Sequence, residues 1–203
     1  MKILFDNPLC QNPLVSFILL DWSCRESFHI FDYLDKQSIP RDQYEVVWIE
    51  YYTRCSPEIQ TLFEDAEKAG EHPPVDRWIV MEMPETTYYH KHLMYNVGIV
   101  ASRGEIVTLC DSDVLLGPNF VASIVESFDD SSDAGIVLHL DEVRNIEKKH
   151  YPFNSPSINE LTQGKCINWR DGKTLGLQDK EDSLHTLNYG ACMGALREDL
   201  IRI

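Results

Sequence analysis

Five apolar segments of strand length, separated by stretches with helical spacing, constrain the fold of this chain most. They are residues 14–20, 44–49, 75–83, 105–110 and 134–140. The first, LVSFILL, is continuously apolar, which is typical of a strand buried on both faces of a parallel sheet. Strands that alternate with helices form βαβ units. The pattern therefore predicts an α/β fold with a mostly parallel central sheet and helices on both faces.

The stretches between these segments carry helix signals. Residues 23–26 are typical of a capping box, with a serine at the N-cap and a glutamate three positions later. A Ser-Pro pair at 56–57 begins a second helix, which we expect to stop at Gly70. Helices are also predicted over 88–102 and after 117–118. The plan is Rossmann-like, but no G-x-G-x-x-G follows the first strand, and no P-loop sequence is present.

Length and charge narrow the class of protein. The 203 residues predict a single domain, at about 100–200 residues per domain. Within it we expect residues 14–140 to form the regular core and 141–203 an irregular region. The formal net charge of −15 argues against binding to nucleic acid, which needs clustered Lys and Arg, and against docking on an anionic membrane.

Neither a membrane span nor an export signal is evident. The longest apolar run is seven residues, whereas a spanning helix needs about 20. The N-terminus lacks the continuous apolar stretch of a secretory signal, so a cytoplasmic protein is expected. Six cysteines contain no C-x-x-C pair, and we expect free thiols in a reducing compartment.

Carboxylates follow three of the predicted strands. Asp21 comes after the first, Glu50 after the second, and Asp111-Ser112-Asp113 after the fourth. Ligands of open parallel sheets bind beyond the carboxyl ends of the strands, so these side chains are expected at one edge. Two carboxylates one residue apart suit a hard cation such as Mg²⁺ or Mn²⁺, which is commonly shared with a substrate's phosphates. Taken alone, such a D-x-D is more often a solvated turn than a metal site.

The surroundings of this D-x-D resemble a known family. The stretch 98–120, GIVASRGEIVTLCDSDVLLGPNF, is similar to the core of family 2 glycosyltransferases with the GT-A fold. The resemblance covers most of residues 14–140 and returns at 189–203. The residues that carry it are Asn96, Gly98, Ala101, Gly104, Glu105, Asp111, Asp113 and Pro118.

The resemblance implies a role for each matched side chain. Asp21 and Glu50 would lie against the base and ribose of a nucleotide-sugar donor. Asp111 would face the ribose or the sugar. Asp113, with Asp111, would bind the Mn²⁺ or Mg²⁺ that bridges the donor diphosphate. The implied donor-binding set is completed by Asn96 and Ser112. The sequence departs from the family at Tyr95, where an arginine often precedes the asparagine, and at Leu20-Asp21, where a proline is common.

The implied reaction is metal-dependent transfer of a sugar from a UDP- or GDP-sugar to a saccharide or other hydroxyl acceptor, with inversion, as in polysaccharide biosynthesis. The family's general base follows the stretch that residues 188–203 resemble, so we expect it beyond Ile203 and expect this chain to be cut short there. Glu198 and Asp199 match the wrong part of the pattern.

Two alternatives stay open at this point. A catalytically silent domain that binds nucleotide or carbohydrate would show the same donor motifs without the base. A sugar-nucleotide pyrophosphorylase would need a glycine-rich phosphate loop after the first strand, and residues 21–25 contain no glycine. His90 and His92 could suggest a metal pair, but positions i and i+2 of a helix face different sides, which favours surface histidines.

Overall fold

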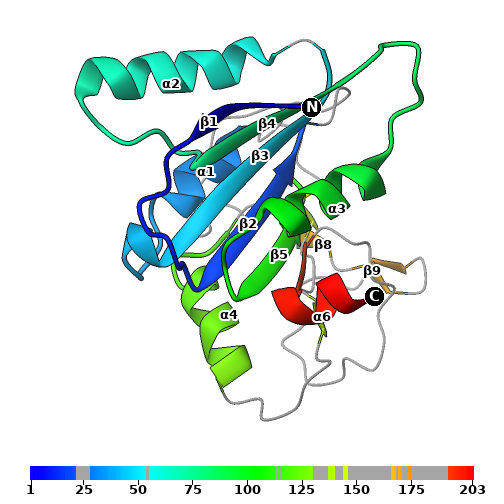
Figure 1. The fold of residues 1–203 in the computed structure, drawn as a ribbon. Helices are drawn as coiled ribbons and strands as arrows, with labels where there is room; N and C mark the ends of the chain where they lie inside the picture. The colour runs from blue at the N-terminus through cyan, green and yellow to red at the C-terminus, as the bar shows by residue number, and fades with distance from the viewer. Residues whose placement is uncertain are drawn as a thin grey trace.

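A seven-stranded sheet forms the centre of the fold in the computed structural model of this chain (Figure 1). The residues that the structure describes are 1–21, 28–53, 55–112, 114, 116–129, 137–139, 144–145, 166–167, 169–170, 173–174 and 192–203. The strands, in spatial order, are β1 (Lys2–Asp6), β4 (Arg77–Met83), β3 (Tyr44–Tyr52), β2 (Val15–Leu20), β5 (Ile106–Cys110), β11 (Cys192–Leu196) and β6 (Val137–His139). The four strands from β4 to β5 are parallel, whereas β1 and β11 run antiparallel to their neighbours.

Helices connect and cover these strands. They are α1 (His29–Leu34), the 3-10 helix η1 (Arg41–Gln43), α2 (Pro57–Ala69), α3 (Lys91–Ala101), α4 (Phe120–Asp129) and α6 (Arg197–Arg202). Two short antiparallel pairs lie apart from the main sheet: β7 (Arg144–Asn145) with β8 (Cys166–Ile167), and β9 (Trp169–Arg170) with β10 (Lys173–Thr174). Among the described residues, no helix combines the length and apolarity needed to cross a bilayer.

The predicted α/β class is confirmed. All five expected strands are present as β2 to β6, and the helix expected after Ser56 begins at Pro57 and stops at Gly70, whose φ of 70° is left-handed. The helix expected over 88–102 begins later, at Lys91. The strand expected over 75–83 begins at Arg77, directly after Asp76, whose carboxylate accepts a hydrogen bond from the backbone N–H of Val46 (2.7 Å). The predicted capping box falls in residues 22–27, outside the described part.

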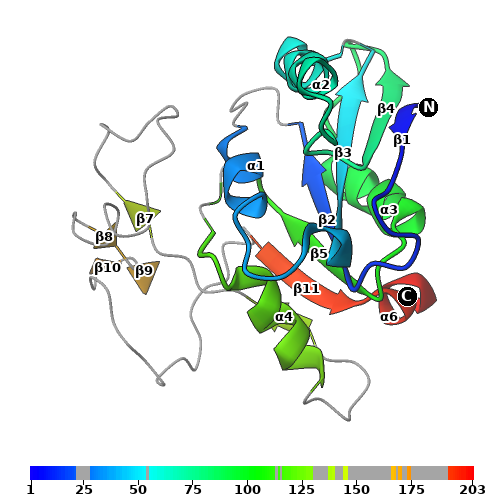
Figure 2. The same ribbon diagram turned by 90° about the vertical axis from the view of Figure 1, so that its left-hand side faces the viewer.

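The central strand β2 separates two apolar cores. All six of its residues are buried, and successive side chains point to opposite faces of the sheet. Phe17 and Leu19 pack into the core formed with α1, α2 and α4, and Ile18 and Leu20 into the core formed with α3. Figure 2 shows α1, α2 and α4 on one side of the sheet, and α3 and α6 on the other. The prediction that this strand is buried on both faces of the sheet is therefore confirmed.

Gly98 sets how closely α3 approaches the sheet. A Cβ at this position would overlap Cγ2 of Ile18 and come within 3.0 Å of Cδ1 of Ile49. A helix residue with any side chain here would hold α3 away from β2 and β3. The glycine thus places the preceding turns of α3 against the carboxyl ends of the central strands.

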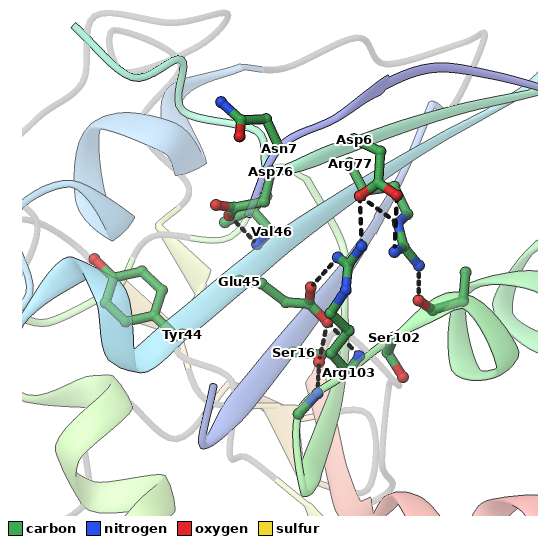
Figure 3. A network of polar contacts seen from close by, with 12 residues as sticks. Asp6, Asn7, Ser16, Tyr44, Glu45, Val46, Asp76, Arg77, Ser102 and Arg103 are labelled. Atoms are coloured by element: carbon green, nitrogen blue, oxygen red, sulfur yellow. Dashed lines mark hydrogen bonds and ion pairs between the residues drawn. The ribbon is translucent and has the colours of Figure 1, made fainter. Parts of the chain in front are cut away.

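A polar network lies at the opposite edge, where the parallel strands begin (Figure 3). The buried Glu45 carboxylate accepts hydrogen bonds from Ser16 Oγ (2.6 Å), the Arg103 backbone N–H (2.5 Å) and Arg103 Nη1 (3.2 Å). Arg103 Nη2 also donates to the Asp6 carboxylate (2.6 Å). The same carboxylate accepts two hydrogen bonds from the Arg77 guanidinium. Ser16 Oγ in turn accepts the Gly104 N–H (2.7 Å). The network joins β1, β2, β3 and β4 to the turn between α3 and β5.

The Asp6 carboxylate makes part of the stability depend on pH. Burial raises its pKa, but hydrogen bonds from Arg103 and Arg77 outweigh burial and hold the pKa below its usual value. A lowered carboxyl pKa contributes stability that is complete above the unfolded-state pKa of about 4 and is lost as the pH falls through the folded-state value. Because Asp6 is partly exposed, the effect should be below about 1 kcal/mol.

We therefore expect Asp6→Asn to be less stable than the parent at pH 7 and to lose less stability between pH 5 and pH 3, measured by urea unfolding. Asp42→Asn, at an exposed position of η1, is the control and should follow the parent curve. Parallel curves for Asp6→Asn and the parent across this range would contradict the pKa shift.

The described cysteine thiols are free. Cys10, Cys55, Cys110 and Cys192 form no disulfide, which confirms the prediction for these four.

Candidate functional site

The order of the strands locates the candidate site. From β2 the chain steps outward to β3 and β4, and then returns to β5 on the other side of β2. In open α/β sheets, ligands bind at such a switch point, in the crevice beyond the carboxyl ends of the two diverging strands. Here these strands are β2 and β5, which pair in parallel with Leu19 opposite Cys110. Asp21 and Asp111 follow them directly, so the sheet brings both to one edge.

Asp111 is held by two residues of α3. Lys91 Nζ donates to its Oδ1 at 2.5 Å, and Tyr95 Oη donates to the same oxygen at 3.4 Å. The ammonium also lies 5.4 Å from the centroid of the Tyr95 ring. The side chains of Lys91 and Asp111 are 25% and 24% exposed, so the ion pair is open to solvent on one side. A ligand entering the crevice can therefore reach both charges.

Tyr95 remains a hydrogen-bond donor over the whole working range of pH. Burial first, and then the negative charge of Asp111, raise the pKa of its phenol well above the ordinary value. The neutral hydroxyl can donate to the carboxylate at any pH near neutrality. Tyr95 thereby fixes one oxygen of Asp111 whether or not Lys91 is engaged.

Glu50, which the resemblance assigns to the base and ribose of a donor, makes several contacts within the protein. Its side chain is fully buried. Oε1 accepts hydrogen bonds from the indole N–H groups of Trp48 (3.0 Å) and Trp78 (3.1 Å), and both carboxylate oxygens lie near the backbone N–H of Ser56 (3.1 and 3.2 Å). Since Ser56 is the N-cap of α2, Glu50 fastens the start of this helix to β3 and β4.

The other predicted residues are distributed around this edge. Asp21 is 5% exposed, and its backbone carbonyl accepts a hydrogen bond from Tyr89 Oη at 2.7 Å. Ser112 is buried beside Asp111. Asn96 is exposed on α3, one position after Tyr95 and thus about 100° around the helix from it. Asp113, the predicted metal ligand, lies outside the described residues.

Tyrosines at the end of β3 position the segment that leads into α3. Tyr51 Oη donates to the carbonyl of Tyr88 (2.9 Å), and Tyr52 Oη to that of Thr87 (3.3 Å). The rings of Tyr51 and Tyr89 meet edge to face with centroids 5.3 Å apart. Together with the Tyr89 bond to Asp21, these contacts tie residues 87–89 to the ends of β2 and β3. They fix where α3 starts, and hence where Lys91 stands.

Lys91 is not among the residues predicted from the sequence, although its neighbours His90 and His92 are discussed there. His90 and His92 are exposed, as predicted for surface histidines. The signal that could have found Lys91 is its spacing from Tyr95 and Gly98, at i+4 and i+7. These positions share one face of a helix, and the glycine marks that face as the one in contact with the sheet.

Helix α6, the last element of the chain, contacts the C-terminal end of α3. Arg197 at the start of α6 donates to the carbonyls of Ile99 (3.2 Å) and Val100 (3.1 Å) at the end of α3, where a cation also offsets the helix dipole. Glu198 and Asp199 both pair with Arg202 on α6, at 3.1 and 3.5 Å. This arrangement gives the two carboxylates an ordinary surface role within a helix.

The donor chemistry of the site suits a hard cation. Among the described residues, no three His, Cys, Asp or Glu side chains lie close enough together to enclose a metal ion. Mg²⁺ and similar ions, however, are commonly held by one or two carboxylates together with substrate phosphates. The partly exposed Asp111 carboxylate provides such an open oxygen ligand, so the residues present fit a cation that arrives with its substrate.

Comparisons with known proteins identify relatives of the fold. No protein-family model matches the chain, and no curated protein sequence matches it. Among solved structures, the mannosyltransferase PcManGT from Pyrobaculum calidifontis, in complex with GDP-Man and Mn²⁺, aligns with 100% of this chain and 50% of its own, at TM-score 0.51 and 19% identity. TarS 1–349 from S. aureus, in complex with UDP-GlcNAc, aligns with 64% of this chain and 32% of its own, at TM-score 0.43 and 18% identity.

The chain thus spans half the length of the mannosyltransferase that it matches. At this identity the likeness concerns the fold. The chain has the Rossmann-like α/β fold of a glycosyltransferase of known structure.

Proposed function

We propose that this chain is the nucleotide-sugar-binding part of a family 2 glycosyltransferase, which transfers a sugar to a saccharide or other hydroxyl acceptor with inversion. The observation that carries the proposal is the position of Asp111, about a quarter exposed at the switch point of the sheet, next to the β2 strand that Asp21 follows. A solved structure with the same fold is a mannosyltransferase that binds GDP-Man and Mn²⁺.

The proposed donor site uses the residues around this crevice. Asp21, Glu50, Asn96, Asp111 and Ser112 are assigned to the donor, with Asp111 and Asp113 as ligands of Mn²⁺ or Mg²⁺. Glu50 also holds the start of α2, since its buried carboxylate accepts bonds from two indole N–H groups and from the Ser56 N–H. When bound, the metal would supply Lewis-acid stabilisation of the charge that develops on the departing nucleoside diphosphate.

The chain's own residues orient the site before the donor arrives. Tyr95 and Lys91 hold the Asp111 carboxylate in one place. Preorganised ligands cost no rearrangement when the donor binds. Asp21 and Ser112, which lie beside Asp111 at the ends of these strands, are both buried.

A thermal-shift experiment tests this proposal. UDP, GDP and the corresponding nucleotide sugars are added at high excess, with and without Mn²⁺. A ligand at about 100 times its dissociation constant stabilises the folded state by about 2.7 kcal/mol, which raises the melting temperature by several degrees. We expect one nucleotide series to give this shift with Mn²⁺, and Asp111→Asn to lose the metal-dependent part of it.

Asp42→Asn, remote from the crevice, should keep the full shift. The absence of a shift with every nucleotide would refute the donor site. A shift without transfer or donor hydrolysis would instead favour a silent nucleotide-binding domain.

A further inference from the structure

Lys91 stands at the crevice for a structural reason. It is the first residue of α3, and Tyr95 follows one turn later on the same helix face. Gly98 continues this face and lets α3 pack directly against Ile18 and Ile49. The close approach carries the first turn of α3 to the end of β5, where the Lys91 ammonium meets the Asp111 carboxylate at 2.5 Å.

The charge of Lys91 has a second use once a donor enters. Asp21 and Asp111 at this edge repel the diphosphate of a nucleotide sugar. The Lys91 ammonium offsets the charge of Asp111 as long as no other cation does so. If Asp111 held a metal ion, that ion would offset the carboxylate charge, and the Lys91 ammonium could pair with a phosphate instead. A lysine carries a compact charge on a flexible four-carbon stem, which suits such a change of partner.

We propose that Lys91 exchanges Asp111 for the donor diphosphate when the donor and its metal ion bind, while Tyr95 keeps the Asp111 carboxylate in place. Lys91 is then a phosphate-binding residue of the donor site, and Tyr95 a positioning residue. This inference rests on the proposed function, because it requires a nucleoside diphosphate in the crevice. It adds a cation from α3 to a site that is otherwise described by its carboxylates.

Titration calorimetry with UDP and GDP in the presence of Mn²⁺ tests the first part. For the nucleotide that binds the parent chain, we expect Lys91→Ala to weaken the affinity about 10- to 100-fold, which corresponds to a lost hydrogen bond between charged groups. Lys91→Arg should recover part of the loss. Uridine or guanosine, which carries no phosphate, should bind Lys91→Ala and the parent alike, which also shows that the variant is folded.

A second series separates phosphate binding from simple neutralisation of Asp111. In EDTA, where no metal contributes, Asp111→Asn should bind the nucleoside diphosphate more tightly than the parent, since the Lys91–Asp111 ion pair is removed together with one negative charge. The double variant Lys91→Ala/Asp111→Asn should bind the nucleoside diphosphate about tenfold or more weakly than Asp111→Asn alone. Lys68→Ala, at an exposed position of α2 far from the crevice, should match the parent throughout.

Three results would overturn the inference. The first is equal nucleotide affinity in the double variant and Asp111→Asn, which would reduce Lys91 to a counter-charge. The second is an equal loss of nucleoside and nucleotide binding in Lys91→Ala, which would indicate a general distortion. The third is failure of the parent chain to bind either nucleotide. This result would refute the proposed function together with the inference, whereas the first two would refute the inference alone.

Discussion

Replacing Gly104 with alanine is expected to lower the free energy of unfolding by about 3 kcal/mol or more, the upper end of what overpacking costs. A Cβ at this position would lie 2.6 Å from Ser16 Oγ, 2.7 Å from the Ser16 backbone nitrogen and 2.8 Å from the carbonyl carbon of Val15. Two of these atoms belong to the backbone of the central strand β2 and cannot turn aside. The turn before β5 would have to move, which also breaks the Gly104 N–H bond to Ser16.

Urea unfolding followed by circular dichroism measures this loss, with Gly117→Ala as the matched control. No atom lies within 4 Å of a Cβ built on Gly117, and its φ is not left-handed. Its substitution should be neutral or stabilise by a few tenths of a kcal/mol, because alanine restricts the unfolded chain. Similar unfolding curves for the two alanine variants would show that the turn at Gly104 yields more easily than its contacts indicate.

Replacing Glu45 with alanine should cost about 3–5 kcal/mol, the range found when one partner of a buried ion pair is removed. The Glu45 side chain is 2% exposed and accepts bonds from Ser16, the Arg103 backbone and the Arg103 guanidinium. Without it, the hydroxyl and the backbone N–H lose their acceptor inside the protein, and Arg103 keeps only Asp6 as an ion-pair partner in the network. The total stability of a domain is about 5–15 kcal/mol, so this is a large share.

Glu67→Ala on the exposed side of α2 controls for the loss of a glutamate, and it should change stability by less than about 0.5 kcal/mol. Combining Glu45→Ala with Arg103→Ala tests the coupling directly. If the network acts as a unit, the double variant is more stable than the sum of the single losses predicts. Additive losses would mean that the Arg103 guanidinium is not energetically coupled to Glu45.

Much of the fold was predictable because its signals are local. The run at 14–20 is apolar except for Ser16 since β2 is covered on both faces, and the Ser-Pro pair at 56–57 marks the first turn of α2 as expected. The antiparallel strands were harder to foresee. Nothing in the sequence of β1, Lys2–Asp6, specifies that it pairs with β4, and β11 takes its place between β5 and β6 only through contacts with segments far away in the chain.

The site was predictable in position but not in its contacts. That Asp21 and Asp111 share an edge follows from the strand order, which the alternating pattern implies. The burial of Glu50 depends on two indole N–H donors, Trp48 in the same strand and Trp78 in the neighbouring β4. A sequence pattern cannot show a cross-strand donor such as Trp78. Likewise, the pairing of Lys91 with Asp111 depends on how far α3 sinks onto the sheet at Gly98, which is a matter of packing between helix and sheet.

The late position of β11 in the chain has a consequence for biosynthesis. β11 covers the full length of β5, from Cys192 opposite Cys110 to Leu196 opposite Ile106, yet the ribosome makes it long after the strands from β1 to β5. In the meantime a nascent sheet ending in β5 presents an open row of backbone donors and acceptors, which can capture any extended segment. Pairing between segments so distant in sequence is also slow. The yield of native protein therefore depends on shielding the outer edge of β5 until β11 emerges.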